Sequence, residues 1–464
     1  MRATTLRWSA TGFAMTLFLT TSAAAQQPPA DPQSEIEQLA SKIEELDQQL
    51  RVLQRKLEID KEQAAEKVKV TPTVTAGREG YALKSADGDF QVKFRGYIQA
   101  DGRFVGDNDT TSGPTTFALR RVRPVLEATA FRIFDFKLMP DFGQGQAVLY
   151  DAYADARFAP WLKLRIGKYK PQFGLERLQS ATELTFIERG TPTNIAPNRD
   201  LGASLYGDLA GERLSYAIGV FNGVVDGGNA DLDDKSGKDV LARIFALPFK
   251  NAESDAFKGL GAGFAVTSGS QHGTLTAPDL PTYKTAAQQT HFRYRADGTV
   301  EGTTVADGAH WRVGPQGYYY VGSIGFLSEY YVSSQRVRRN VTSDDVQTRA
   351  WQISGVYALT GEKESYRGIS PRQNFDRSKG TWGGFELTAR YGELKVDDDA
   401  LSYFANPSTA AGEAQDSVVG VNWYLNRFVK ITGQFENITF RGGAPNGGDR
   451  PTERGFYTRL QFAF

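Results

Sequence analysis

A fifteen-residue stretch of strict alternation constrains the fold of this 464-residue chain more than any other feature. Every even position from Phe90 to Phe104 is apolar or glycine, and every odd position carries a polar side chain. Such a strand is far longer than the roughly five to six residues usual in soluble sheets. We therefore expect one face of the strand to meet an apolar environment and the other to meet water.

The same alternation returns along the chain, in about sixteen segments. The apolar face is rich in Phe, Tyr, Trp, Ala and Gly, a mixture typical of a lipid-facing wall with aromatic girdles. A closed barrel also satisfies every backbone group without leaving an edge strand. The sequence therefore predicts an all-β fold, a sixteen-stranded antiparallel transmembrane β-barrel over residues 84–464. The alternative is a secreted soluble sandwich, whose buried face would be richer in Val, Ile and Leu.

The composition excludes several other classes of protein. The absence of cysteine excludes thiol catalysis, disulfides and thiolate metal sites. The equal numbers of basic and acidic residues, 54 of each, argue against a nucleic-acid partner. The three histidines, His272, His291 and His310, are spaced by 19 residues, which fits no compact metal-ligand motif, and we expect them in an exposed loop. We predict no metal, no cofactor and no catalytic residue.

The first 25 residues are typical of a cleaved secretory signal peptide. Arg2 and Arg7 give a basic start, Phe13–Leu19 an apolar centre, and Ala23–Ala25 a small-residue exit. A membrane anchor is the alternative, but the apolar centre is too short to span a bilayer. The sequence thus predicts export across the inner membrane.

The segment 31–66 has a helical period. Its apolar residues are spaced by three and four in turn, which predicts a short coiled coil and hence an oligomer. They are Ile36, Leu39, Ile43, Leu46, Leu50, Leu53 and Leu57. Isoleucine and leucine share the a positions, so the number of helices stays open. A single amphipathic helix packed on a globular domain is the alternative, and residues 67–83 are expected to form a linker.

Basic residues gather on the polar faces of the first strands. A barrel of about sixteen strands is wide enough for a water-filled lumen, so inward side chains must set its selectivity. Three guanidinium groups within four residues would also be costly beside lipid. The basic residues that we expect to face the lumen from strands are Lys93, Arg95, Arg103, Arg120, Arg121, Arg123, Lys163 and Arg165. Guanidinium groups match phosphate geometry and keep their charge, so these residues predict an anion path.

The segment 171–200 is long, lacks alternation and carries Arg177, Arg189 and Arg199. By its position we predict a loop that enters the pore after the fifth strand and narrows it. These arginines would help to charge the passage. In the alternative interpretation, each basic residue pairs with a nearby carboxylate such as Glu188.

Motifs around this segment resemble those of a known family. Gly167–Glu176 reads GKYKPQFGLE, Phe186–Arg189 reads FIER and Asn198–Gly202 reads NRDLG. They resemble the GKFKxPFGxE, FxERS and PxRDxG stretches of the phosphate-selective porins O and P. The resemblance covers residues 84–464, and the family's paired arginines fall on Arg120 and Arg121. It implies a trimeric outer-membrane barrel with an inward-folded loop and arginines along an anion path.

The sequence therefore predicts a non-enzymatic outer-membrane channel, surrounded by lipid, for passive diffusion of inorganic phosphate, its short polymers or other small anions. One alternative is a porin of broader or different anion preference. Another is an envelope tether, in which the coiled coil carries the function and the pore is incidental. An outer-membrane lipid hydrolase is disfavoured because no serine sits in a recognisable motif.

Overall fold

The computed structural model describes residues 32–77, 80–106, 115–231 and 237–464. The predicted signal peptide, residues 1–25, lies outside the described residues. The chain divides into two compact units, Met1–Lys69 and Val70–Phe464, which we describe separately.

The first unit holds nearly all of one long helix, α1 (Pro32–Val70). The seven apolar residues of the predicted coiled-coil seam are each at least 55% exposed in the single chain. The helix is thus amphipathic with an uncovered stripe, and the coiled coil itself stays a prediction. Among the described helices, none is both long and apolar enough to cross a membrane.

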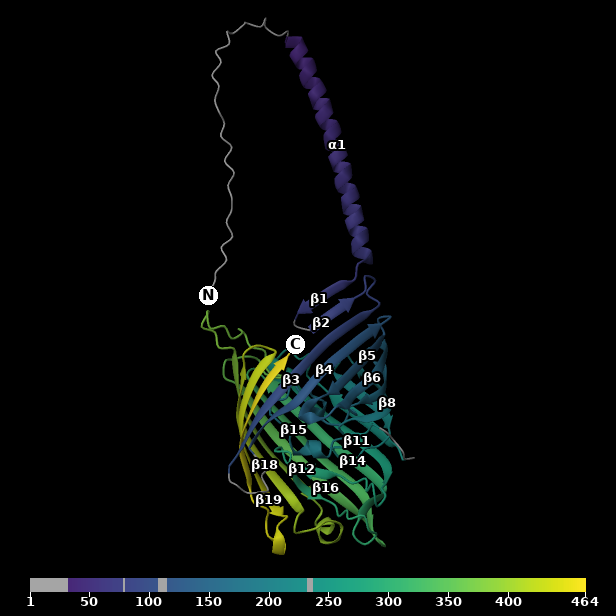
Figure 1. Ribbon diagram of the computed structural model, residues 1–464, viewed down its shortest axis with the longest axis vertical. Coiled ribbons are helices and arrows are strands. Elements are labelled where there is room, and N and C mark those ends of the chain that lie inside the picture. The colour runs from purple at the N-terminus through teal and green to yellow at the C-terminus, as the bar shows by residue number, and fades with distance from the viewer. Residues whose placement is uncertain (1–31, 78–79, 107–114, 232–236) are drawn as a thin grey trace, which may run out of the picture. The chain divides into compact units, whose positions relative to one another are not determined.

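The second unit is a closed antiparallel barrel, as predicted. Among the described residues sixteen strands form it, and it closes where β20 pairs with β3 (Figure 1). The first eight are β3 (Gln91–Val105), β4 (Thr116–Ala130), β5 (Phe134–Asp141), β6 (Val148–Ala159), β7 (Leu162–Tyr169), β8 (Asp200–Leu209), β9 (Leu214–Phe221) and β10 (Asp239–Ala246). The other eight are β11 (Leu260–His272), β14 (Thr304–Val321), β15 (Ile324–Arg339), β16 (Thr342–Ala358), β17 (Gly384–Val396), β18 (Ala411–Tyr424), β19 (Val429–Gly442) and β20 (Glu453–Ala463).

Smaller elements lie at the rims and in the loops. The hairpin of β1 (Thr73–Gly77) and β2 (Gly80–Lys84) occupies part of the segment expected to be a linker, and it extends the sheet beside β3. A separate two-stranded sheet joins β12 (Thr282–Lys284) and β13 (Thr290–Arg293). The short helices are α2 (Leu175–Leu178), α3 (Asp255–Lys258), η1 (Gly143–Gly145), η2 (Thr191–Asn194), η3 (Ala400–Phe404) and η4 (Pro445–Gly447).

The two faces of the strands differ as the alternation predicts. On β3, Phe94 and Ile98 are 45% and 43% exposed, whereas Gln99 and Asp101 are 1% and 3% exposed. The inverted pattern, with apolar side chains outside and polar ones inside, is the opposite of a soluble sheet. It is the arrangement that lipid outside and water inside would stabilise.

The loops of one rim fold inward and fill part of the barrel. Phe173, from the segment between β7 and β8, is fully buried and stacks edge-on against Tyr331 of β15, with ring centres 5.0 Å apart. Tyr283 and Phe292, from the β12–β13 sheet, are buried in the same cluster. The opposite rim has mostly short turns, but the segment 359–383 between β16 and β17 is long, which the alternation had not indicated.

Candidate functional site: a basic cavity beside the inward loop

A cavity of about 670 Å³ opens inside the barrel. Strands β3 to β7 and β20 line it, together with the end of β18 and the turn that follows it, the segment 170–199 and part of the segment 359–383. Among the described residues, its eight basic lining residues are Arg95, Arg123, Lys137, Arg165, Lys170, Arg199, Arg367 and Arg427. Its acidic lining residues are Asp151 and Glu183. The lining is therefore strongly basic, although the whole chain carries no net charge.

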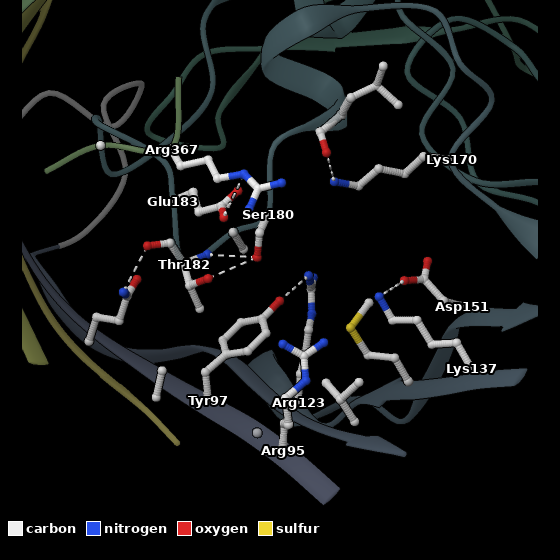
Figure 2. Close-up of a pocket in the computed structure, with 18 of the residues that line it drawn as sticks. Arg95, Tyr97, Arg123, Lys137, Asp151, Lys170, Ser180, Thr182, Glu183 and Arg367 are labelled. Carbon is white, nitrogen blue, oxygen red and sulfur yellow. Dashed lines mark hydrogen bonds and ion pairs between the residues drawn. The ribbon is translucent and has the colours of Figure 1, made fainter. Parts of the chain in front are cut away.

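Arg123 is held rigidly at the wall of this cavity (Figure 2). Its Nε donates to Asp141 at 2.7 Å, and one terminal nitrogen donates to the Tyr97 hydroxyl at 2.9 Å. The guanidinium also lies over the Tyr150 ring, 4.1 Å from the ring centre. Among the described residues the third nitrogen has no hydrogen-bond partner, so it is available to an anion in the cavity.

Local structure explains why Asp141 can hold Arg123. The Asp141 carboxylate also accepts hydrogen bonds from the backbone N–H groups of Val122 and Gly143, each at 3.0 Å. A Cβ at Gly143 would lie 2.6 Å from the Arg120 carbonyl oxygen, so only glycine allows the turn to approach β4 this closely. The turn after β5 therefore fixes the arginines of β4.

Arg165, Arg199 and Arg95 are other predicted residues that line the cavity. Arg165 donates twice to Asp155, at 2.8 and 2.7 Å, and Arg199 donates to Asp151 at 3.1 Å. The carboxylates that pair with Arg95, Arg123 and Arg165 are not themselves part of the lining. Within this cavity the charged groups of the lining are therefore mainly basic, although Glu127 and Asp155 line a neighbouring cavity.

Four of the basic lining residues escaped the sequence analysis. Lys137 occupies an inward-facing polar position of the alternation on β5, and its Nζ lies 3.4 Å from Asp151. The alternation therefore indicated that Lys137 faces the interior. Lys170 adjoins β7 and donates to the Gln179 carbonyl at 2.7 Å. Arg367 reaches the cavity from the segment 359–383 and lies 4.0 Å from Glu183 (Figure 2). Arg367 and the turn residue Arg427 had no local sequence signal.

Arg120 and Arg121 both point inward, although neighbouring residues of a strand normally face opposite sides. The ladder between β3 and β4 shifts here: Gln99 pairs with Arg121 and Ala100 pairs with Leu119. Arg120 is the extra residue of a β-bulge, which lets two adjacent side chains share one face. Neither arginine lines the cavity, because both reach a carboxylate of the inward loop.

The inward loop, residues 170–199, follows the fifth barrel strand and is held by polar side chains of the facing wall. Lys430 of β19 donates to the Leu184 carbonyl at 2.6 Å, and Gln99 of β3 donates to the Ala181 carbonyl at 2.8 Å. Thr191 Oγ1 donates to the Trp351 carbonyl of β16 at 3.1 Å. The loop thus crosses the interior and reaches several distant strands.

Arg177 and Arg189, expected to charge the passage, lie within this loop and outside the cavity lining. Arg189 donates to the carbonyls of Glu176 and Gln179, each at 2.8 Å, and Arg177 donates to the Thr193 carbonyl. Backbone carbonyls that face no strand need such donors when they are buried. This geometry favours a part in shaping the loop over contact with an ion.

The remaining predicted residues lie at other places on the inner wall. Arg103 donates to the Ala287 carbonyl at 3.2 Å and is 8% exposed. Lys93 lines a second cavity, of about 710 Å³, bounded by β3 to β6. Lys163 pairs with Asp208 at 3.0 Å.

The expectation that the three histidines lie exposed in one loop is wrong, because His272 is the last residue of β11 and only His291 lies between β11 and β14. The connection between β11 and β14 spans only residues 273–303, so His310 belongs to β14. His291 and His310 are 1% and 2% exposed. His310 lies 3.1 Å from Asp226, which folds in from the β9–β10 connection. In the described part of the chain, no group of three or more His, Cys, Asp or Glu side chains could hold a metal ion.

A closed sixteen-stranded barrel with an apolar outer wall, a polar interior and a loop folded into its lumen defines an outer-membrane porin. A model of the phosphate-selective porin O and P family matches residues 90–464, and the chain belongs to that family. This agrees with the motif resemblance and places the protein in the bacterial outer membrane.

Porin O of Pseudomonas aeruginosa is 25% identical over 411 residues, which cover 83% of this chain and 91% of Porin O. Among solved structures, the outer-membrane channel DcaP of Acinetobacter baumannii has a TM-score of 0.52 at 13% identity, covering 82% of this chain and 99% of DcaP. An anion-selective porin from Comamonas acidovorans has a TM-score of 0.50 at 10% identity, covering 81% of this chain and all of that porin. These two structures share the fold of this chain.

Proposed function

We propose that this porin is an anion-selective channel for passive diffusion of phosphate or its short polymers. The observation that carries the proposal is the cavity lining, in which eight basic residues face two acidic ones. Guanidinium groups fixed by tyrosines and carboxylates are preorganised donors for a tetrahedral oxyanion, and they lose little entropy when an anion arrives.

Passage through such a channel needs no covalent chemistry, cofactor or metal. An anion would move from one basic group to the next, bound strongly enough to enter and weakly enough to leave. We propose that Arg95, Arg123, Arg165 and Arg199 line this path, whereas Arg177 and Arg189 hold the loop that borders it. Outer-membrane lipid would contact the apolar wall.

The proposal is tested with purified protein in planar bilayers. A potassium chloride gradient should give a reversal potential with the sign of anion selectivity, and phosphate added at constant chloride should block chloride current. A cation-selective reversal potential would contradict the proposal. Anion selectivity without phosphate block would instead support the alternative function, a porin of broader or different anion preference.

The uncovered stripe of α1 favours a second proposal, a homo-oligomer. A trimer fits both the family and the trimer form of OmpT of Vibrio cholerae, a structure of similar fold with a TM-score of 0.50.

If deletion of residues 31–66 left conductance intact but weakened the cell envelope, the tether function would gain support.

A further inference from the structure

Glu188 lies on the inward loop among four arginines that come from three strands. Its carboxylate oxygens lie 2.6 Å from Arg120, 3.1 Å from Arg121, 3.2 Å from Arg459 and 3.6 Å from Arg103. Burial would raise the pKa of Glu188, but the positive charges of the surrounding arginines outweigh this effect and hold the pKa well below its usual value. The carboxylate therefore stays ionised at ordinary pH.

The cluster holds more positive than negative charge. Among the described residues, these four arginines form ion pairs with one further carboxylate, that of Asp101. Asp101 accepts hydrogen bonds from Arg459 at 2.7 and 2.8 Å. Four guanidinium groups therefore face two carboxylates in a buried volume. The arrangement suits a tetrahedral oxyanion that carries more than one negative charge.

The cluster adjoins the basic cavity. Arg121 donates to the Gln99 side-chain oxygen at 2.7 Å, and Gln99 donates in turn to the Gln461 side-chain oxygen at 2.7 Å. Gln461 lines the cavity. Two carboxamide side chains thus separate the arginine cluster from the space in which we place the anion path.

The backbone around Glu188 is held without its carboxylate. Arg390 donates to the Glu188 carbonyl at 2.9 Å, and the Ile187 N–H donates to Gln434 at 3.0 Å. These bonds use main-chain atoms of the loop, so they do not depend on the Glu188 side chain.

We propose that Glu188 is a tethered anion whose carboxylate occupies an inner oxyanion site formed by Arg103, Arg120, Arg121 and Arg459. This inference rests on the proposed anion channel. It identifies Glu188 as the residue that lowers the affinity of the inner site for anions. An anion in transit must compete with a carboxylate already present, which keeps binding weak enough for release. Without Glu188, the same four arginines would retain the anion.

The test replaces Glu188 and measures phosphate block of chloride current in planar bilayers. Glu188→Ala removes both the charge and the volume of the carboxylate. We expect the phosphate concentration for half block to fall about tenfold or more, because a close buried charge pair is worth at least that factor. The control is Asp398→Ala in the connection between β17 and β18, because its exposed carboxylate lies 4.0 Å from Lys395 and lines neither cavity, so the block should stay nearly unchanged. Unchanged or weakened block in Glu188→Ala would overturn the proposal.

Two further measurements keep the proposal testable if Glu188→Ala does not fold. Glu188→Gln retains the volume and removes the charge, so it should raise the anion-to-cation permeability ratio, and a lower ratio would count against the proposal. Wild-type crystals soaked in selenate should show no anomalous signal among the four arginines, whereas selenate bound there beside an unmoved Glu188 would refute competition. A cation-selective wild type would instead reject the channel function itself, so the two failures are distinguishable.

Discussion

Arg427 offers the cleanest removal of one charge from the basic cavity. It lies in the short turn between β18 and β19, is exposed, and has no ion-pair partner among the described residues. Arg427→Gln therefore leaves no buried carboxylate without its ion-pair partner, whereas the loss of Arg123 would remove the ion-pair partner of Asp141. We expect the variant to fold normally and to become less anion-selective.

The size of the expected change in selectivity follows from the volume of the cavity. A sphere of about 670 Å³ has a radius of roughly 5 Å, which places an anion at its centre roughly 7 Å from a guanidinium in the wall. In water, unit charges at that separation interact by about 0.6 kcal/mol, and 0.1 M salt screens this to about 0.3 kcal/mol. The charge attracts anions and repels cations equally. The anion-to-cation permeability ratio should thus fall about threefold at 0.1 M salt and about fivefold at 0.01 M.

Reversal potentials at both salt concentrations provide the measurement. Arg377→Gln is the control, since Arg377 lies in the segment 359–383 of the same rim but outside the cavity lining. An unchanged ratio in Arg427→Gln, or an equal change in the control, would show that this cavity does not set the selectivity. A change independent of salt concentration would rule out the electrostatic explanation.

Three other predictions concern the turn, the ion cluster and the helix. Gly143→Ala should destabilise the folded barrel by roughly 1–3 kcal/mol in urea titrations, because its Cβ would press on the Arg120 carbonyl. The ion pairs of Glu188 are lost only as pH falls through its depressed pKa, so the difference in selectivity between wild type and Glu188→Gln should persist from pH 7 to pH 5. Because the chain has no cysteine, Leu50→Cys at the helix seam should give disulfide-linked dimers on non-reducing gels, whereas Gln48→Cys on the opposite face should not.

The strand pattern was predictable because it depends on each strand alone. A side chain such as Ile98 faces lipid whenever its neighbours Tyr97 and Gln99 face the interior, so parity can be read without knowing the partners. The segment 359–383 has no such signal. It is positioned by contacts with distant residues, such as the stacking of Tyr366 on Tyr318 with ring centres 5.3 Å apart. Local alternation carries no information about contacts of that kind.

The same distinction separates the predicted parts of the cavity from the missed ones. Arg123 and Arg165 follow from strand parity, and both line the cavity. Arg120 breaks parity and points inward only because of a bulge beside the turn at Gly143. Arg367 arrives from a rim segment whose path depends on the rest of the fold. Strand parity therefore predicts most basic residues of the strand wall, including Lys137, which was overlooked, whereas Arg367 and Arg427 of the rim have no such signal.

The charge balance of the whole chain does not describe the basic cavity, because the acids and bases have different surroundings. On the far wall, Arg390 pairs with Asp416 at 2.9 Å and lies 3.8 Å from Glu436, and both acids are at most 3% exposed beside the inward loop. These acids are buried and lie outside the lining of the basic cavity. The arginines of the cavity also have acidic partners, but of these partners only Asp151 and Glu183 line the cavity, beside eight basic groups. We therefore expect the sign of selectivity to depend on which charges the loop 170–199 leaves uncovered, and not on how many charges the chain contains.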